Sequence, residues 1–158
     1  MPNQIDRTLL NDVAISVLEQ TAFIFCEAAN LQDGIDLDAF EFIKVRIEFS
    51  GDQDGLVIAI APGKFCCELA ENMLGEELIT EECGEKNIDA LKEILNIIAG
   101  QYLIRLYGDR AVFDLSAPEA TEISSEELCN MVGQYDFGCC LSDDYPILTL
   151  ALAAKEVI

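Results

Sequence analysis

The sequence predicts an α+β fold in which helices pack on one face of a mainly antiparallel sheet. Three observations support this prediction. The chain has 158 residues, which is enough for one hydrophobic core. Segments with helical periodicity and segments with strand alternation follow one another in the order α-β-β-α-α-β-β-β. Strands and helices do not alternate regularly, which argues against a doubly wound parallel sheet.

The first half of the chain contains two predicted helices and a hairpin. Residues 4–28 have apolar side chains at a period near 3.6, which predicts a helix. An acidic connection at 31–41 leads to residues 43–49, where apolar and charged residues alternate as in a half-buried strand. A glycine-rich acidic turn separates this strand from the apolar run 56–61, its hairpin partner. A second helix at 64–75 ends at a glycine.

The second half again begins with a long helix and continues into strands. After an acidic loop at 76–84, residues 86–107 form a third helix that Gly108 closes. Residues 119–131 are a polar connection for which the pattern predicts no secondary structure. Three strands complete this half, at about 111–116, 132–141 and 146–154. Because each half opens with a long helix followed by a hairpin, the sequence indicates a duplication.

Charge and composition exclude several classes of function. Lys and Arg number 9 and Asp and Glu number 30, which gives a net charge of −21. A chain this acidic repels nucleic acids and anionic membranes, and it prefers protein partners or cations. It has no His, which excludes Ser-His-Asp catalysis, Cys-His catalysis and His-ligated metal sites. The N-terminal residues lack a signal-peptide pattern and no apolar run reaches bilayer length, so we expect a cytoplasmic protein.

Seven cysteines are present, four of them in two adjacent pairs at 66–67 and 139–140. An odd count with adjacent pairs does not fit a disulfide framework. Because there is no C-x-x-C motif, zinc-ribbon, iron–sulfur and thioredoxin-type sites are not expected. We expect reduced, mostly buried thiols that act as small apolar residues. A redox or metal role is the alternative.

The helix at 86–107 carries a polar row opposite its predicted core face. On a helical wheel Glu93, Asn96 and Gly100 lie within about 40° of Asp89. The predicted core face lies on the other side and comprises Leu91, Ile94, Leu95, Ile98 and Tyr102. Glu93 and Asn96 are one turn apart, about 4.5 Å along the axis, so their side chains can converge on one small target.

Two details distinguish this row from an ordinary solvated helix face, which is the plain alternative. Gly100 lies mid-helix on the exposed side, where glycine costs about 1 kcal/mol relative to alanine. A glycine there allows another backbone to approach closely. Ile97 and Ile104 border the row, which suggests a surface that a partner covers. We therefore interpret the carboxylate and the amide as a recognition or water-positioning site.

The pattern Asp89-x3-Glu93-x2-Asn96 is similar to the signature of the CheC/CheX/FliY phosphatases of bacterial chemotaxis. That signature continues to a proline after about 22 residues, and here Pro118 follows Asn96 after 21. The stretches IIAGQYL and LAENMLGEE also resemble the family. The element order agrees over nearly the whole chain, so residues 1–158 are expected to form one CheX-like domain with a CheC/CheX-like fold.

The first half carries no second copy of the motif. At the equivalent offset of 77 residues, Asp12 matches, but Ser16 and Glu19 replace the Glu and the Asn. We therefore expect the first-half position to be inactive. One intact motif at this chain length is similar to CheX rather than to CheC. The resemblance to CheX implies a homodimer.

The resemblance implies a phosphatase that hydrolyses the aspartyl phosphate of a CheY-type response regulator. Asn96 would orient the attacking water, and Glu93 would engage the regulator's active-site Lys. The regulator supplies Mg²⁺ and the phosphorylated Asp, so this chain need bind no cofactor or metal. Asp89 would orient the helix or rim the site, while Pro118 would be structural.

Two other functions remain open from the residues alone. The chain could be a non-catalytic adaptor that docks a regulator in a two-component or flagellar switch system, since a fold does not determine function. The intact Glu93 and Asn96 pair favours catalysis. A cation-binding module is the third candidate, with carboxylates at Asp33, Asp36 and Asp38, or at Asp52 and Asp54. Neither stretch matches an EF-hand loop, so we interpret these residues as solvated loop and turn positions.

Overall fold

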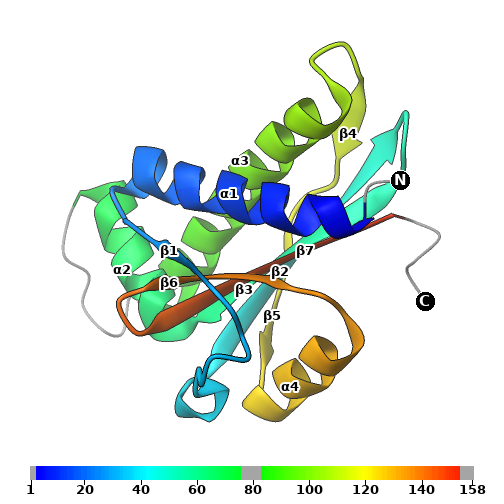
Figure 1. The fold of residues 1–158 in the computed structure, drawn as a ribbon. Helices are drawn as coiled ribbons and strands as arrows, with labels where there is room; N and C mark the ends of the chain where they lie inside the picture. Colours follow the sequence, from blue (N-terminus) through cyan, green and yellow to red (C-terminus); the bar gives the residue numbers. More distant parts are fainter. Residues whose placement is uncertain (1–2, 76–82, 154–158) are drawn as a thin grey trace.

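The computed structural model describes residues 3–75 and 83–153, and an antiparallel sheet forms its centre (Figure 1). Within that part of the chain the sheet has seven strands in the order β1-β6-β7-β3-β2-β4, and β5 also pairs with β2. The strands are β1 (Glu27–Ala29), β2 (Phe42–Gly51), β3 (Gly55–Pro62), β4 (Phe113–Leu115), β5 (Glu119–Ile123), β6 (Gly138–Ser142) and β7 (Tyr145–Ala153). All six pairings are antiparallel, which confirms the predicted type of sheet.

Three long helices cover one face of this sheet, as predicted (Figure 1). They are α1 (Asn3–Ala22), α2 (Gly63–Leu74) and α3 (Cys83–Tyr107). A short 3-10 helix, η1 (Leu37–Ala39), and a fourth helix, α4 (Ser125–Gln134), lie on the opposite face. The strand β5 and the helix α4 are both additions to the predicted elements, because the pattern at 119–131 predicts no secondary structure.

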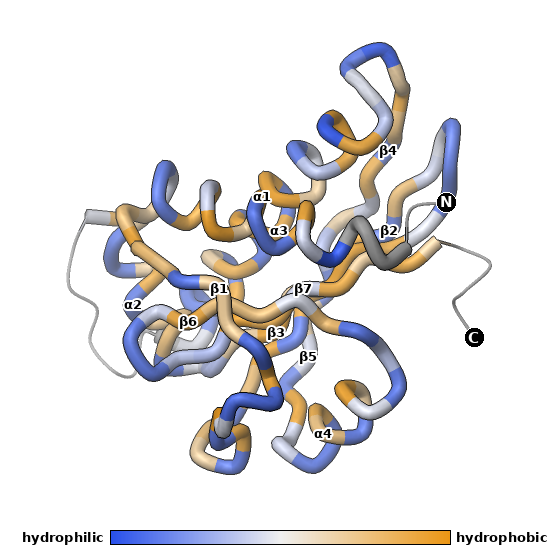
Figure 2. Tube along the Cα trace, viewed as in Figure 1, coloured by the Kyte–Doolittle hydropathy of each residue, from blue (hydrophilic) through white to orange (hydrophobic). Residues whose placement is uncertain are grey.

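Strand alternation divides the apolar side chains between two cores. In the β2–β3 hairpin, Val45 and Ala59 face the larger core, which α1, α2 and α3 close. Their neighbours Ile58 and Ile60 face a smaller core under α4, together with Leu128 of that helix. Successive strand residues point to opposite faces, so the apolar run at 56–61 is explained by burial on both sides. Figure 2 shows the hydrophobic centre of the sheet between hydrophilic outer turns.

Each half of the chain contributes edge strands to the hairpin of the other half. The strands β3 and β7 are neighbours at the centre, and each is half of a hairpin. The strand after α1, β1, joins the second-half hairpin through β6, whereas β4 and β5, which follow α3, join the first-half hairpin through β2. This reciprocal arrangement agrees with the duplication that the sequence indicated.

Two predicted boundaries are wrong. The first helix ends at Ala22, not at 28, because Phe23 adopts a left-handed conformation with φ 56° and residues 27–29 pair with β6. The strand predicted at 132–141 begins only at Gly138, because α4 continues to Gln134. The predicted ends of α2 and α3 are confirmed by left-handed glycines at 75 and 108.

Most of the acidic loop predicted at 76–84 lies outside the described residues, although α3 already includes 83 and 84. None of the helices in the described ranges is long and apolar enough to cross a membrane.

Candidate functional site

The helix α3 is held in place by its apolar face. Its predicted core residues are each at most 1% exposed: Leu91, Ile94, Leu95, Ile98 and Tyr102. The helix contacts α1 and α2 beside it and β2, β3 and β5 beneath it. Because this face is buried along three turns, the rotation of α3 about its axis is fixed, and so is the direction of its opposite side.

The polar row lies on that opposite side and faces solvent. Asp89, Glu93 and Asn96 are exposed, and Gly100 is partly exposed. Within the described residues, no hydrogen bond or ion pair engages the side chains of Asp89, Glu93 or Asn96. A carboxylate and an amide one helical turn apart are therefore available to a partner molecule.

Packing among the described residues does not account for the glycine in this row. A Cβ built on Gly100 would meet nothing within 4 Å beyond the helix's own backbone. Ile97 is half-buried against the main core, whereas Ile104 is 56% exposed. The row thus combines polar side chains, an open glycine and an exposed apolar side chain, as expected where a second molecule approaches a helix closely.

A hollow of about 820 Å³ adjoins the N-terminal end of α3. Asn87 and Ile88 of the helix line it together with Glu122 and Ser124 from the β5–α4 segment. The Asn87 Nδ2 amide donates to the Gly63 carbonyl oxygen at 3.0 Å, which ties α3 to the start of α2. The hollow reaches α3 at Ile88, one residue before Asp89, and the lining residues do not include those of the polar row.

Pro118 lies in the break between β4 and β5, which both pair with β2. On the N-terminal side of this break, the Ser116 amide donates to the Glu48 carbonyl oxygen at 2.8 Å. The Ser116 hydroxyl accepts from the Glu48 amide at 2.9 Å. Proline has no N–H to donate, so an interruption of the ladder suits it, and its position agrees with a structural role.

The corresponding row on α1 has a different character. Asp12 and Glu19 are exposed, while Ser16 is half-buried. The Ser16 hydroxyl accepts a hydrogen bond from the side-chain Nε2 of Gln20 at 3.3 Å. The helix lies beside α3 on the same face of the sheet (Figure 1). At these three positions α1 therefore lacks the carboxylate and amide that lie one turn apart on α3.

Three of the described cysteines, Cys66, Cys139 and Cys140, are buried, and their pKa values are raised. Burial raises the pKa of the Cys66 thiol to about 12 and that of Cys139 to about 11, so both are protonated at neutral pH. A hydrogen bond between Cys26 and Cys140 lowers the pKa of Cys26 and raises that of Cys140. The sequence had given no signal for this pairing, because it depends on β1 lying against β6.

The acidic loop residues have local structural partners. The Asp36 carboxylate accepts from the Asp38 amide at 3.0 Å and caps η1. The Asp54 carboxylate accepts from the Gly51 amide at 3.2 Å in the β2–β3 turn. Across the described ranges, no group of three or more Cys, Asp or Glu residues could hold a metal ion. The Asp36 and Asp54 carboxylates thus have local roles, in a helix cap and in a turn.

Comparison with known proteins agrees with this geometry. The family model for the chemotaxis phosphatase CheX matches residues 43–137, which include both hairpin strands of the first half and the whole polar row. Comparison with curated proteins gives no match.

Solved structures of this fold family superpose over nearly the full chain. The crystal structure of the CheX-CheY-BeF3-Mg complex from Borrelia burgdorferi is 23% identical, with a TM-score of 0.65 over 95% of this chain and 99% of that one. CheX from Vibrio vulnificus is 16% identical, with a TM-score of 0.65 over 93% and 96%. FliY from Thermotoga maritima is 14% identical, with a TM-score of 0.60 over 97% and 92%.

At these identities the superpositions establish the fold, and the family follows from the sequence match. The CheX model covers more than half of the residues, including the helix that presents Glu93 and Asn96. The chain therefore belongs to the CheX family of chemotaxis phosphatases.

Proposed function

We propose that this protein accelerates hydrolysis of the aspartyl phosphate of a CheY-type response regulator. In this proposal Asn96 positions the attacking water and Glu93 contacts the regulator's active-site Lys. The observation that carries it is the exposure of these two side chains, free of bonds to the described residues, on a helix fixed by its buried face. The CheX family match and the CheX-CheY complex from Borrelia burgdorferi support a regulator of this type as the partner.

The chemistry suits a chain without histidine. In the reaction a water oxygen attacks phosphorus, the bond from phosphorus to the aspartyl oxygen breaks, and the products are carboxylate and inorganic phosphate. The carboxylate is a good leaving group, so the reaction mainly needs a water in line and compensation of the phosphoryl charge. The Asn96 carboxamide can accept a hydrogen bond from that water and donate another to a phosphoryl oxygen.

Glu93 would serve docking more than the chemical step. Its carboxylate, one turn before Asn96, can form a charge-assisted hydrogen bond with the regulator's Lys and so fix the position of Asn96 over the phosphate. Asp89, Ile97, Gly100 and Ile104 would complete the contact surface. In this arrangement Mg²⁺ and the phosphorylated Asp belong to the regulator, and the proposal requires no cofactor held by this chain.

Two copies of the chain are also part of the proposal, because CheX-like proteins, to which the sequence is similar, are typically homodimers. Sedimentation of the purified protein should give about twice the monomer mass of 17.4 kDa. A monomer over the whole accessible concentration range would refute this part and leave the assignment of Asn96 and Glu93 unaffected.

The proposed function can be tested with the single substitution Asn96→Ala. Phosphate release from a phosphorylated CheY-type regulator should fall about a hundredfold, the usual effect of losing one positioned hydrogen-bonding group. Thermal unfolding should change little, because Asn96 is exposed and lies off the core face. Asn130→Ala on α4, also exposed, is the matched control and should retain full activity.

The same assay distinguishes the non-catalytic adaptor. An adaptor would bind the phosphorylated regulator without shortening the lifetime of its phosphate, and Asn96→Ala would change nothing. If Glu93 docks the regulator, Glu93→Ala should raise KM more than it lowers kcat, since its contact exists before and during the reaction. Equal turnover by wild type and Asn96→Ala would overturn the assigned role of Asn96.

A further inference from the structure

The connection between α1 and β1 exposes two aromatic side chains. Phe23 is 73% exposed and Phe25 is 70% exposed, whereas Ile24 between them is buried in the main core at 3%. Figure 2 shows this connection as a hydrophobic stretch on the outside of the molecule, where α1 ends. Neither ring belongs to the two hydrophobic cores, and exposed apolar surface of this kind is typical of an interaction site.

The backbone makes Phe23 more unusual still. Its φ is 56°, the left-handed conformation in which glycine is strongly preferred. Its amide donates to the Glu19 carbonyl oxygen and the Ile24 amide donates to that of Leu18, both at 3.1 Å. The first of these is the bond of an αL cap, which closes α1. The helices α2 and α3 end in the same conformation with Gly75 and Gly108. Only at α1 does an exposed aromatic ring stand at this cap in the described chain.

A third exposed apolar residue lies at the neighbouring helix end. The side-chain Nδ2 of Asn72 donates to the Ala22 carbonyl oxygen at 2.9 Å and thereby holds the C-terminal ends of α1 and α2 together. Leu74, the last residue of α2, is 54% exposed. We call Phe23, Phe25 and Leu74 the α1–α2 patch.

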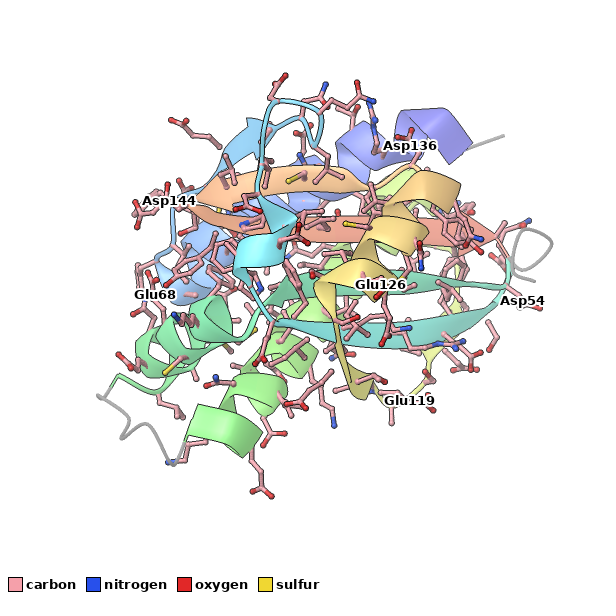
Figure 3. All side chains as sticks on the ribbon, turned by 90° about the horizontal axis from the view of Figure 1, so that it is seen from below. Asp54, Glu68, Glu119, Glu126, Asp136 and Asp144 are labelled. Atoms are coloured by element: carbon pink, nitrogen blue, oxygen red, sulfur yellow. The ribbon has the colours of Figure 1, made fainter. Side chains whose placement is uncertain are left out.

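Negative charge lies beside the α1–α2 patch in the described part of the chain. Two helix C-termini meet here, each with negative partial charge, and neither last turn contains a basic residue. Glu19 and Glu27 are exposed on either side of the aromatic pair. Glu68 of α2 is close enough to Cys26 to influence it electrostatically. Figure 3 shows Glu68 and Asp144 at this same end of the molecule.

We propose that the α1–α2 patch binds a basic amphipathic segment of a protein partner, with aliphatic side chains against Phe23 and Phe25 and Lys or Arg at the surrounding carboxylates and helix ends. Cationic groups satisfy both helix C-termini and can also stack on the phenyl rings. This interaction goes beyond the proposed phosphatase function, because none of these residues belongs to the polar row of α3.

Other occupants fit the charge less well. In a two-fold dimer built on this surface, the patch of one copy would meet the patch of the other, and Glu19 and Glu27 would face their own equivalents. An anionic membrane would be repelled in the same way. A basic amphipathic partner instead reduces the repulsion among these carboxylates. Its apolar side chains complement the exposed rings and its cationic side chains complement the negative charge.

Three synthetic 18-residue peptides test the proposal on the full-length protein. One carries Leu and Lys at helical spacing, the second replaces Leu by Ser, and the third replaces Lys by Glu. Calorimetric titration should give the strongest binding for the Leu/Lys peptide, weaker and strongly salt-dependent binding for the Ser/Lys peptide, and none for the Leu/Glu peptide. Amide NMR shifts for the Leu/Lys peptide should centre on residues 19–27 and the end of α2.

Substitutions identify the site. Phe23→Gly removes the ring and suits the left-handed backbone, so it should keep or raise Tm while weakening the Leu/Lys peptide about tenfold, as for an interface anchor. Phe25→Ser should weaken binding similarly. Val112→Ser is the matched control, because Val112 is 71% exposed but lies between α3 and β4. It should leave binding unchanged.

The proposal is overturned if Phe23→Gly binds the Leu/Lys peptide as wild type does, or if Val112→Ser weakens it equally. It is also overturned if Phe23→Gly changes the sedimentation of the protein alone, which would assign the patch to a second copy, or if anionic vesicles bind and compete with the peptide. Phosphate release from the regulator should be the same in wild type and Phe23→Gly, so failure here and failure of the phosphatase proposal give different results.

Discussion

Replacing Gly100 by Ala separates what the fold needs from what the proposed site needs. The added methyl would meet no atom within 4 Å beyond the local helix backbone, and the position lies inside α3. The helix therefore gains the difference in propensity between the two residues, about 1 kcal/mol. In a domain of this length, that gain corresponds to a rise in Tm of about 2–4 °C.

The same methyl should impair the activity. It stands in the row formed by Glu93 and Asn96, where the proposed regulator approaches the helix. Crowding a close contact by one methyl costs about 1–2 kcal/mol of binding, which corresponds to a five- to thirtyfold rise in KM. Because Asn96 itself is unchanged, kcat should fall much less. Stability and activity thus move in opposite directions.

The assay combines thermal unfolding followed by circular dichroism with phosphate release at several regulator concentrations. Gly133→Ala provides the control, since Gly133 lies in α4 with equally open space around its Cβ position. It should raise Tm slightly and leave KM unchanged. A lower Tm for Gly100→Ala would mean that this face of α3 packs against something within the protein. An unchanged KM would mean that no partner approaches the helix at Gly100.

Two further predictions concern stability. Burial raises the Cys66 pKa from 9.0 to about 12, so above pH 9 the unfolded chain loses a proton that the native state retains. Cys66 should therefore contribute no change to the free energy of unfolding below pH 9 and a fall of about 1.4 kcal/mol per pH unit between pH 9 and 12. Urea titrations should show a shallower fall for Cys66→Ala, in which only Cys139 and Cys140, whose pKa values are also raised, still contribute. Gly51→Ala should lower the urea-derived stability by about 2–4 kcal/mol, because φ is 145° and the new Cβ would collide with the Val112 carbonyl oxygen; a change below about 0.5 kcal/mol would contradict this reason.

The parts of the fold that could be predicted are those in which the local pattern and the tertiary packing agree. The helix at 86–107 has a continuous apolar face, and that face is buried as expected. The hairpin of 43–49 and 56–61 has alternation on one strand, an apolar run on the other and a glycine turn between them. The position of the polar row on the exposed side of α3 followed from the same periodicity, because fixing the buried side fixes the opposite one.

The parts that were missed depend on contacts distant in sequence or on weak local signals. The three-residue strand β1 exists because it pairs with β6, more than 100 residues later, whereas the local apolar pattern of residues 24–26 predicts that the helix continues. The helix α4 did have a readable signal. Ser124 and Glu127 have the spacing of a capping box, and the Ser124 hydroxyl does accept from the Glu127 amide at 3.1 Å.

The sequence predicts the exposed polar row of α3 but not the exposed aromatic residues at the end of α1. A polar row opposite an apolar face is visible in a sequence, but an exposed aromatic residue is not, since phenylalanine is normally buried. Phe23 and Phe25 extend the apolar pattern of α1 and would be assigned to the core from sequence alone. Their exposure follows from the left-handed turn at Phe23, which sends Ile24 inward and the two rings outward.

The two halves of the molecule thus present different surfaces from equivalent helices. The offset of 77 residues that aligns Ser16 with Glu93 and Glu19 with Asn96 also aligns Phe23 with Gly100. Where α3 leaves open space for a partner's backbone, α1 ends and places an aromatic ring in solvent. Restoring Glu and Asn on α1 would therefore not be enough to create a second site, because the ring at Phe23 would still prevent the close approach that Gly100 allows. The end of α1 thus presents an aromatic side chain where the aligned position of α3 is open, which fits the proposed binding of a basic segment better than a second site of the proposed phosphatase type.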